Sequence, residues 1–590
     1  MNYKTDTIMI KLIKYVALCS TLVLATSCGD QLRLDEREAS FNKDYFTYSR
    51  YQLTTSIVNV AKSYGQAATD APRGQAALYF MDCYSGDQIP AFYTKTDANW
   101  LFQDKNAYAG TGNDGAGQLR TLEAVRKLAT TEGNMANVAA ADILKCVVAS
   151  YLTEKYGDIP FSEAVQGRTG DIFPKFDSQK EVYENMFAML NNAVSILSDA
   201  NSKGLPADHD VLFKGDKTKW IKFANSLKFR LMVHSYEAFK KAGKDLSADM
   251  QAIASSNNYM SAVADNAGLT FPGTTEAESW YTQRNWGTGN TFTEQKPTKY
   301  LIDQMVALDD PRMYVIFAPV LSPLSSKPAK VDEAVKINGF TYTINHYPAT
   351  ADDAAAMVAA GRDLNGNVTS VPYVLDAKWF GTPNPTNVQA QYGGTGLTGS
   401  NGFYDNRRLT GFSALLSKTS DPRLKAVLME SDEMAFLLAE ARQKGWISAG
   451  TVKGYYENGI KLSFLRWQIE DGTKPATYIG SDKIVDNFTA YYAKPGVALD
   501  GTTADLEKIA TQKWLAMLIT NQNEAYTDYK RTGKPTFIAK IAASFGSYTY
   551  PQRYMYPLDE ASNNKENYNA AVTALGGKDI ASAKMWILNF

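Results

Sequence analysis

The chain has 590 residues with 61 basic and 62 acidic side chains, so its formal net charge at pH 7 is −1. A balance this close to neutral gives no electrostatic footprint for nucleic acid or for an anionic membrane surface. Four cysteines and three scattered histidines exclude a disulfide scaffold and offer no zinc-ligand spacing, although one bridge between Cys83 and Cys146 stays open.

The N-terminus has the pattern of a secretory signal. Lys11 and Lys14 precede an apolar run over residues 15–26 that is too short to span a membrane. Small residues then lead to Cys28, as in the bacterial lipobox, where this thiol is diacylated and the preceding peptide is removed. The alternative is an ordinary cleaved signal that happens to end in cysteine. We predict a signal peptide over residues 1–27 and attachment to the membrane through lipid on Cys28.

The chain after this signal is predicted to be mainly helical. Apolar residues recur at helical spacing in several segments, and loops rich in Gly, Asn and Pro separate the earlier ones, so we expect helices paired as hairpins. No Pro/Ser-rich linker or charge run divides the chain, which favours one domain over residues 28–590. The apolar stripes are Ile143, Leu144, Val147, Val148, Tyr151 and Leu152; Tyr183, Met186, Phe187, Leu190, Val194 and Leu197; Trp220, Phe223, Ala224, Leu227 and Leu231; Met434, Leu437, Leu438 and Ala441; and Ala510, Trp514, Met517 and Leu518.

Two loop-like segments carry the residues suited to sugar recognition, which uses flat aromatic faces together with amide and guanidinium groups. The richer one is SWYTQRNWGTGN, at residues 279–290, and the other is LYFMDCYSGDQIPAFYTKTDANW, at residues 78–100. The alternative is that these aromatic side chains anchor the loops on the scaffold or contact a partner. The candidate ligand-binding residues are Trp280, Tyr281, Arg284, Asn285, Trp286, Tyr84 and Trp100.

Residues 319–410 have a different character, with Gly-, Pro- and Asn-rich stretches around short β-like pieces such as FTYTI and VPYVL. Long irregular segments of this kind are usually functional surface or disorder. Asp363, Asn365 and Asn367 have the spacing of a calcium loop but lack its Gly and its bidentate Glu, so calcium stays open. No other cofactor is expected, because the G-x-G-x-x-G strings in this Gly-rich chain do not follow a buried parallel strand.

A set of segments, taken in order, resembles the SusD/RagB family. YGDIPFSEA resembles the family signature YGDIPYSEA, with Phe161 in place of Tyr, and WIKFANSLKFRL resembles its W.KFANSLKLRL helix. DPRM, ESDEMAFLLAEARQKGW, EKIATQKWLAM, YKRTGKP and RYMYPLDE follow at the family's positions. These segments cover nearly the whole chain after Cys28.

The resemblance implies a fold of tetratricopeptide-like helical hairpins with an irregular, loop-rich second half. It also implies a non-catalytic lipoprotein on the outer membrane that captures an oligomeric nutrient as a lid over a TonB-dependent, SusC-like barrel. Asp30, Asp35 and Glu36 resemble the surface-export signal of Bacteroidetes lipoproteins, so we expect the protein to face the cell exterior.

Several functions stay open at this point. The tryptophans favour an oligosaccharide ligand over the oligopeptide of a RagB-like protein. A surface glycoside hydrolase would need two loop carboxylates facing one cleft, for which Glu276, Glu278 and Glu294 are the nearest candidates. Glu433 and Glu440 lie on an expected core helix, where pairing with Arg230 is favoured over catalysis. A purely structural lid over the barrel would bind no ligand.

Overall fold

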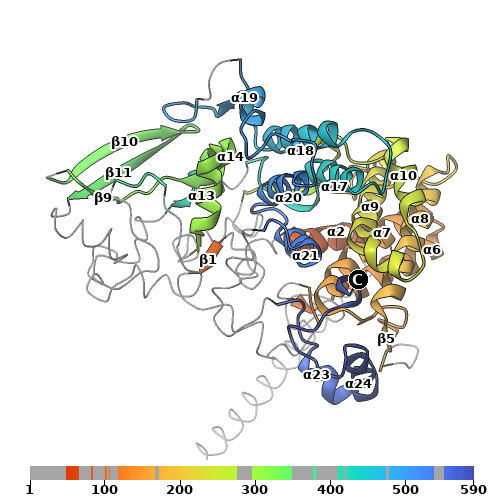
Figure 1. Cartoon of the computed structure of the whole chain (residues 1–590). Coiled ribbons are helices and arrows are strands. Elements are labelled where there is room, and N and C mark those ends of the chain that lie inside the picture. Colours follow the sequence, from red (N-terminus) through yellow and green to blue (C-terminus); the bar gives the residue numbers. More distant parts are fainter. Residues whose placement is uncertain are drawn as a thin grey trace, which may run out of the picture.

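The computed structural model describes residues 48–65, 81–83, 100–102, 105–106, 117–166, 172–274, 295–327, 329–348, 376–379, 410–417, 421–473, 477–536 and 551–589. Most of the described residues are helical, and the strands form small separate sheets. Most of the helices gather on one side of the molecule, and the hairpin β10–β11 projects at the opposite end (Figure 1).

The first half of the chain supplies a row of helices in which neighbours along the sequence pack on each other. Only Gly133 and Asn134 separate α6 from α7, and so short a connection produces an antiparallel pair. The expectation of helical hairpins is confirmed here. The helices are α2 (Ser49–Gly65), α6 (Gln118–Glu132), α7 (Met135–Tyr156), α8 (Gln179–Ser198), α9 (Lys217–Lys241) and α10 (Ser247–Ser256).

Local sequence sets the ends of these helices. Ser178 caps α8 through a capping box, because its hydroxyl accepts a hydrogen bond from the backbone N–H of Glu181 and the Glu181 side chain accepts one from the Ser178 N–H. Asp216 caps α9 by accepting from two backbone N–H groups. The predicted stripes of α8 and α9 are buried except for the half-buried Val194.

Helix α7 differs from the single buried stripe expected from the sequence, because nearly every residue from Ala136 to Tyr156 is buried. It is long and apolar enough to cross a membrane by length and composition, but 89% of its most apolar window lies inside the structure. A helix that is buried on nearly all sides fits the centre of a helical core, and neighbours α6, α8, α2 and α9 surround it.

The turn after α7 follows the physical interpretation of the YGDIP segment. Gly157 ends the helix at a φ of 90°, a conformation that L side chains rarely adopt. The backbone N–H of Gln179 donates to Asp158 at 2.8 Å, and that of Lys175 donates to Glu163 at 2.9 Å. These two carboxylates therefore hold the turn against the start of α8.

The second half returns to the helical side of the molecule. The helix α17 packs on α18, α20 and α9, and the 3₁₀ helix at the C-terminus packs on α8 and α9, with the Trp586 ring 4.9 Å from that of Phe239. One continuous cluster of buried side chains therefore joins both halves of the described chain. The elements are α17 (Ser431–Gln443), α18 (Val452–Arg466), α19 (Phe488–Tyr492), α20 (Asp505–Ala516), α21 (Gln522–Thr532), α23 (Leu558–Asn563), α24 (Lys565–Ala574) and the 3₁₀ helix Trp586–Leu588.

The strands pair segments that lie far apart in the sequence. The antiparallel pairs are β1 (Met81–Cys83) with β7 (Gln295–Pro297), β6 (Ala267–Thr270) with β13 (Lys425–Met429), β8 (Phe317–Ala318) with β12 (Gly411–Phe412), β2 (Leu101–Phe102) with β3 (Lys105–Asn106), and β4 (Ile159–Pro160) with β5 (Phe176–Asp177). The FTYTI piece lies in β11 (Phe340–Pro348), which pairs with β10 (Val331–Ile337) and β9 (Leu324–Ser325), as its β-like pattern predicts. Parallel β14 (Glu470–Asp471) and β15 (Val485–Asp486), and the helices α13 (Lys299–Leu308) and α14 (Pro311–Ile316), complete the described elements apart from two short 3₁₀ turns.

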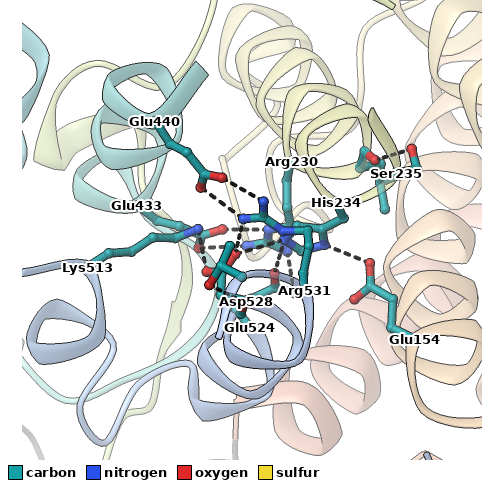
Figure 2. Close-up of polar contacts among 12 residues, drawn as sticks. Glu154, Arg230, His234, Ser235, Glu433, Glu440, Lys513, Glu524, Asp528 and Arg531 are labelled. Atoms are coloured by element: carbon teal, nitrogen blue, oxygen red, sulfur yellow. Dashed lines mark hydrogen bonds and ion pairs between the residues drawn. The ribbon is translucent and has the colours of Figure 1, made fainter. Parts of the chain in front are cut away.

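A buried network of charged side chains lies where α7, α9, α17, α20 and α21 meet (Figure 2). Arg230 on α9 donates from Nε to Glu433 Oε1 at 2.5 Å and from Nη2 to Glu433 Oε2 at 2.7 Å. Its Nη1 lies 3.4 Å from Glu524 on α21. The Arg230 side chain is fully buried, so its contacts join α9 of the first half to α17 and α21 of the second half inside the core.

His234, one helical turn after Arg230, lies between carboxylates on both sides of its ring. Its Nδ1 is 2.8 Å from Glu154 on α7, and its Nε2 is 3.4 Å from Glu524 and 3.6 Å from Asp528. Burial lowers the pKa of His234, but Glu154 and Glu524 outweigh burial and leave it raised. The surrounding acidic groups therefore favour protonation of the imidazole.

The same network continues to a second bidentate pair. Arg531 on α21 donates to both Glu440 oxygens at 2.6 and 2.9 Å, and to Asp528 at 2.8 Å. Lys513 on α20 faces Asp528 at 2.5 Å. The sequence-based pairing of Arg230 with Glu433 is confirmed, whereas Glu440 pairs with Arg531 on α21 instead.

We expect Arg230→Met to lower the free energy of unfolding by about 3–5 kcal/mol, because Glu433 would keep a buried charge without its bidentate partner. Urea unfolding followed by tryptophan fluorescence measures the change. Lys180→Met is the matched control, since the Lys180 and Glu184 side chains are 43% and 38% exposed and such surface pairs contribute less than about 1 kcal/mol. Equal losses in the two variants would contradict the importance of the buried pair.

The network also predicts a dependence of stability on pH. Burial raises the pKa of Glu524 from 4.5 to about 7, against the attraction of Arg230 and His234. The folded protein therefore holds an extra proton between these two values, and its free energy of unfolding falls as the pH rises through that window. Burial lowers the pKa of Lys530 from 10.5 to about 7. Lys530 therefore changes the free energy of unfolding between these two values, above the pH window of Glu524.

Glu524→Gln removes this titrating carboxyl group. We expect the variant to lose up to about 1.4 kcal/mol per pH unit of the wild-type slope between about pH 5 and 7, measured by urea unfolding. Glu184→Gln is the control for the loss of one exposed carboxylate and should keep the slope. A Glu524→Gln variant with the wild-type slope would show that this group does not bind the extra proton.

Candidate functional site

Most of the residues predicted to bind a ligand lie outside the described part of the chain. These are Tyr84, Trp280, Tyr281, Arg284, Asn285 and Trp286. Cys28 and the candidate calcium residues Asp363, Asn365 and Asn367 lie outside it as well, as do the loop carboxylates Glu276, Glu278 and Glu294. The structure instead describes the strands and anchors at which the two aromatic segments enter and leave.

The two aromatic segments share one two-stranded ribbon. Strands β1 and β7 pair antiparallel, with Met81 opposite Pro297 and Cys83 opposite Gln295. The first segment, residues 78–100, continues beyond β1 after Cys83, and the chain that follows the second segment, residues 279–290, enters β7 at Gln295. Because these two residues are register partners, both segments meet the ribbon at the same end.

The ribbon is fixed to the irregular half of the molecule. Strand β7 leads into α13, whose first turn is capped by the buried Thr298 accepting from the backbone N–H of Leu301. Strand β12 lies beside β7 and also pairs with β8, which directly follows α14. Figure 1 shows β1 close to α13.

The far ends of the two segments are held by the helical half. The second segment follows β6, which pairs with β13, and β13 leads directly into α17. The first segment ends at Trp100, next to the C-terminus of α7. Each aromatic segment therefore runs between the helical half and the β1–β7 ribbon.

Trp100 is a correction to the sequence-based expectation of a ligand contact. Its side chain is 4% exposed, and its Nε1 donates to Glu560 at 2.7 Å. The rings of Tyr156, Phe176 and Tyr556 meet the indole edge to face at centroid distances of 5.1, 5.2 and 5.7 Å. Trp100 thus anchors the first aromatic segment on the scaffold, because a ring enclosed in this way has no face left for a sugar.

The paired carboxylates do not form a catalytic pair. Glu433 and Glu440 are buried, and each accepts two hydrogen bonds from an arginine. Burial raises the pKa of Glu440, but Arg531 and Lys444 outweigh burial and leave it well below its usual range, so this carboxyl does not carry a proton to donate. A structural role for both residues, as favoured from the sequence, is confirmed.

One cluster offers the atoms of a metal site. Ligand atoms of Glu154, His234 and Glu524 lie within 4.8 Å of one another, and all three side chains are buried. The same carboxylates already face the His234 ring and Arg230 at hydrogen-bonding or ion-pair distance. The Arg230 guanidinium would repel a divalent cation placed there, so the chemistry of this cluster fits charge balance better than metal binding.

Sequence reasoning missed this cluster, although a signal for it exists. Arg230 and His234 are four residues apart on α9, and Glu524 and Asp528 are four residues apart on α21, so each helix presents two charges on one face.

Cys146, for which a bridge to Cys83 was left open, is free and buried. Burial raises its pKa well above the ordinary value, which keeps the thiol inert.

Two family models match most of the chain. A model described as starch-binding associating with outer membrane matches residues 84–368, and one described as SusD and RagB outer membrane lipoprotein matches residues 377–588. No curated protein matches the sequence.

Solved structures share the fold over nearly the whole chain. A chitin-binding protein is 23% identical, with a TM-score of 0.64, and the match covers 91% of this chain and 99% of that one. A SusD homologue from Bacteroides fragilis is 22% identical, with a TM-score of 0.66 and coverage of 92% and 100%. A SusD-like protein from Bacteroides thetaiotaomicron is 20% identical, with a TM-score of 0.62 and coverage of 91% and 98%.

These similarities confirm the predicted fold of tetratricopeptide-like helical hairpins with a loop-rich second half. Taken with the ordered motifs and the two adjoining family matches, they establish that this chain belongs to the SusD/RagB family of outer-membrane nutrient-binding lipoproteins.

Proposed function

We propose that the protein is a lipid-anchored surface lipoprotein that binds oligosaccharides and passes them to a SusC-like TonB-dependent transporter. Membership of the family supports a role in nutrient binding at the outer membrane. The ligand, the transporter partner, the lipid on Cys28 and the outward orientation are parts of this proposal, as is a single domain over residues 28–590.

The observation that carries the proposal is the pairing of β1 with β7. Tyr84 is the residue directly after this ribbon, and Trp280 and Trp286 belong to the segment that enters it. Two segments that are almost 200 residues apart in the sequence thus have a common base. Aromatic rings and the side chains of Arg284 and Asn285, carried on one base, are the groups that stack on sugar rings and bond to hydroxyls.

Binding without covalent chemistry agrees with the described carboxylates. The paired Glu433 and Glu440 are held by arginines and lie inside the helical core. One similar structure is that of a chitin-binding protein, so the ligand of that protein is a glycan. An oligopeptide ligand, as in a RagB-like protein, is the alternative, and a glycoside hydrolase is a more distant one.

Calorimetry with the protein starting at Gly29 tests the ligand. We expect heat with an oligosaccharide from a panel of starch-, cellulose- and chitin-type chains, and at least about tenfold weaker binding in Trp280→Ala or Trp286→Ala, because each lost stacking face contributes on the order of 1–3 kcal/mol. Product analysis of the same mixtures checks that the glycan stays intact.

Trp446→Phe is the matched control, because its indole stacks on Tyr236 at 4.1 Å in the helical half and is 6% exposed. This variant should bind the glycan as the wild type does. Heat of binding with oligopeptides only would favour the RagB-like function instead. Binding unchanged in both loop variants would remove the aromatic segment as the site, and cleavage of the glycan would favour the hydrolase.

Replacing Cys28 by Ala tests the anchor. We expect the wild-type protein in the outer-membrane fraction, labelled by a fatty acid, and the variant in the soluble fraction without label, since stable anchoring requires acyl chains on this thiol. Protease treatment of intact cells should degrade the wild-type protein if it faces outward. Membrane association that survives in Cys28→Ala would show that another attachment operates.

A further inference from the structure

A cavity lies between α17, α20 and α21, apart from the β1–β7 ribbon. Its volume is about 180 Å³, and it extends to Lys534 and Pro535 after α21. Its apolar wall includes Ile509, Trp514 and Met517. Figure 1 shows these helices on the helical side of the molecule, whereas β1 lies beside α13.

The cavity has an excess of positive charge. Lys444, Lys513, Arg531 and Lys534 line it together with two carboxylates, Glu440 and Asp528. Lys534 is balanced from outside the cavity by Glu507, 3.2 Å away. One positive charge therefore remains uncompensated among these groups.

The two carboxylates are already committed to other lining groups. Glu440 accepts both bonds from Arg531 and lies 3.1 Å from Lys444. Asp528 accepts from Arg531 at 2.8 Å and faces Lys513. Because these acids are held in place, they cannot turn away to make room for a cationic ligand, whereas Lys444, whose side chain is 23% exposed, can turn toward an anion.

Arg531 is the most buried cation of this wall. Its side chain is 3% exposed, and both terminal nitrogens donate to carboxylates. Its Nε has no hydrogen-bond partner within the part of the chain that the structure describes, but the exposed surface of this atom is under 1 Å², so a ligand in the cavity does not reach it. Because a buried charge is screened little, Arg531 still attracts an anion that lies against Lys444.

We propose that this cavity is a second ligand site, which binds a small carboxylate with an apolar body. The apolar body lies against Ile509, Trp514 and Met517, and the carboxylate faces Lys444 and Arg531. A cavity of about 150 Å³ holds one benzene ring, so this one takes a single ring or a branched aliphatic chain and is too small for an oligosaccharide. The carboxylate belongs either to a free acid or to the C-terminal residue of a peptide.

A fluorine NMR titration of the protein starting at Gly29 tests this site, with 4-fluorophenylacetate as the probe. We expect saturable binding with a Kd on the order of 1 mM, as suits a ligand of this size. The uncharged isostere 4-fluorophenylacetamide should bind at least about tenfold more weakly, because it leaves the cations unpaired. A short peptide ending in phenylalanine, compared with its amide, shows whether a C-terminal residue also enters.

Two variants locate the site. Ala510→Phe fills the cavity and should abolish binding, and Lys444→Met should weaken it by about five- to tenfold. Lys180→Met, an exposed change on α8, is the matched control and should bind as the wild type does.

Absence of saturable binding, equal binding of 4-fluorophenylacetamide, or binding unchanged in Lys444→Met would overturn the proposal, even if Ala510→Phe fails to fold. A glycan titration on the same protein separates this result from the proposed function, since neither outcome depends on the other.

Discussion

The fold depends on the buried pair of Arg230 with Glu433, because this contact joins the helices of the first half to those of the second. Around it, carboxylates from α7, α17 and α21 face cations from α9, α20 and α21 inside a continuous apolar core. Each charge is costly to bury alone, so the arrangement is stable only when the helices meet in this one register. Geometry rather than overall hydrophobicity thus selects how the two halves pack.

The same constraint positions the ends of the two aromatic segments in which we propose the ligand site. Strand β13 leads directly into the N-terminus of α17, which carries Glu433, and β13 pairs with β6 at the start of the second aromatic segment. Trp100 fixes the end of the first segment against α7, the helix that also carries Glu154. Both segments are therefore tied to helices of the charge network at one end and to the β1–β7 ribbon at the other.

The cavity at α17, α20 and α21 belongs to the outer part of this network. Arg531 and Asp528 line it and also bond within the network, so a ligand there would contact groups that hold α21 in place. The two proposed sites differ in chemistry, since charged groups line the small cavity and aromatic residues are the candidates for the oligosaccharide.

The sequence by itself determined the mainly helical class, most of the buried stripes and the turn at Gly157. Periodicity and local capping are encoded within a few residues, which is why these features can be predicted without a structure. Tertiary structure alone decided that α7 is buried on nearly all sides, that Glu440 pairs with Arg531, and that Trp100 is enclosed by three aromatic rings. It alone joined residues 83 and 295 in one ribbon. These features arise from contacts between residues far apart in the chain, and no local pattern specifies which distant partner a side chain meets.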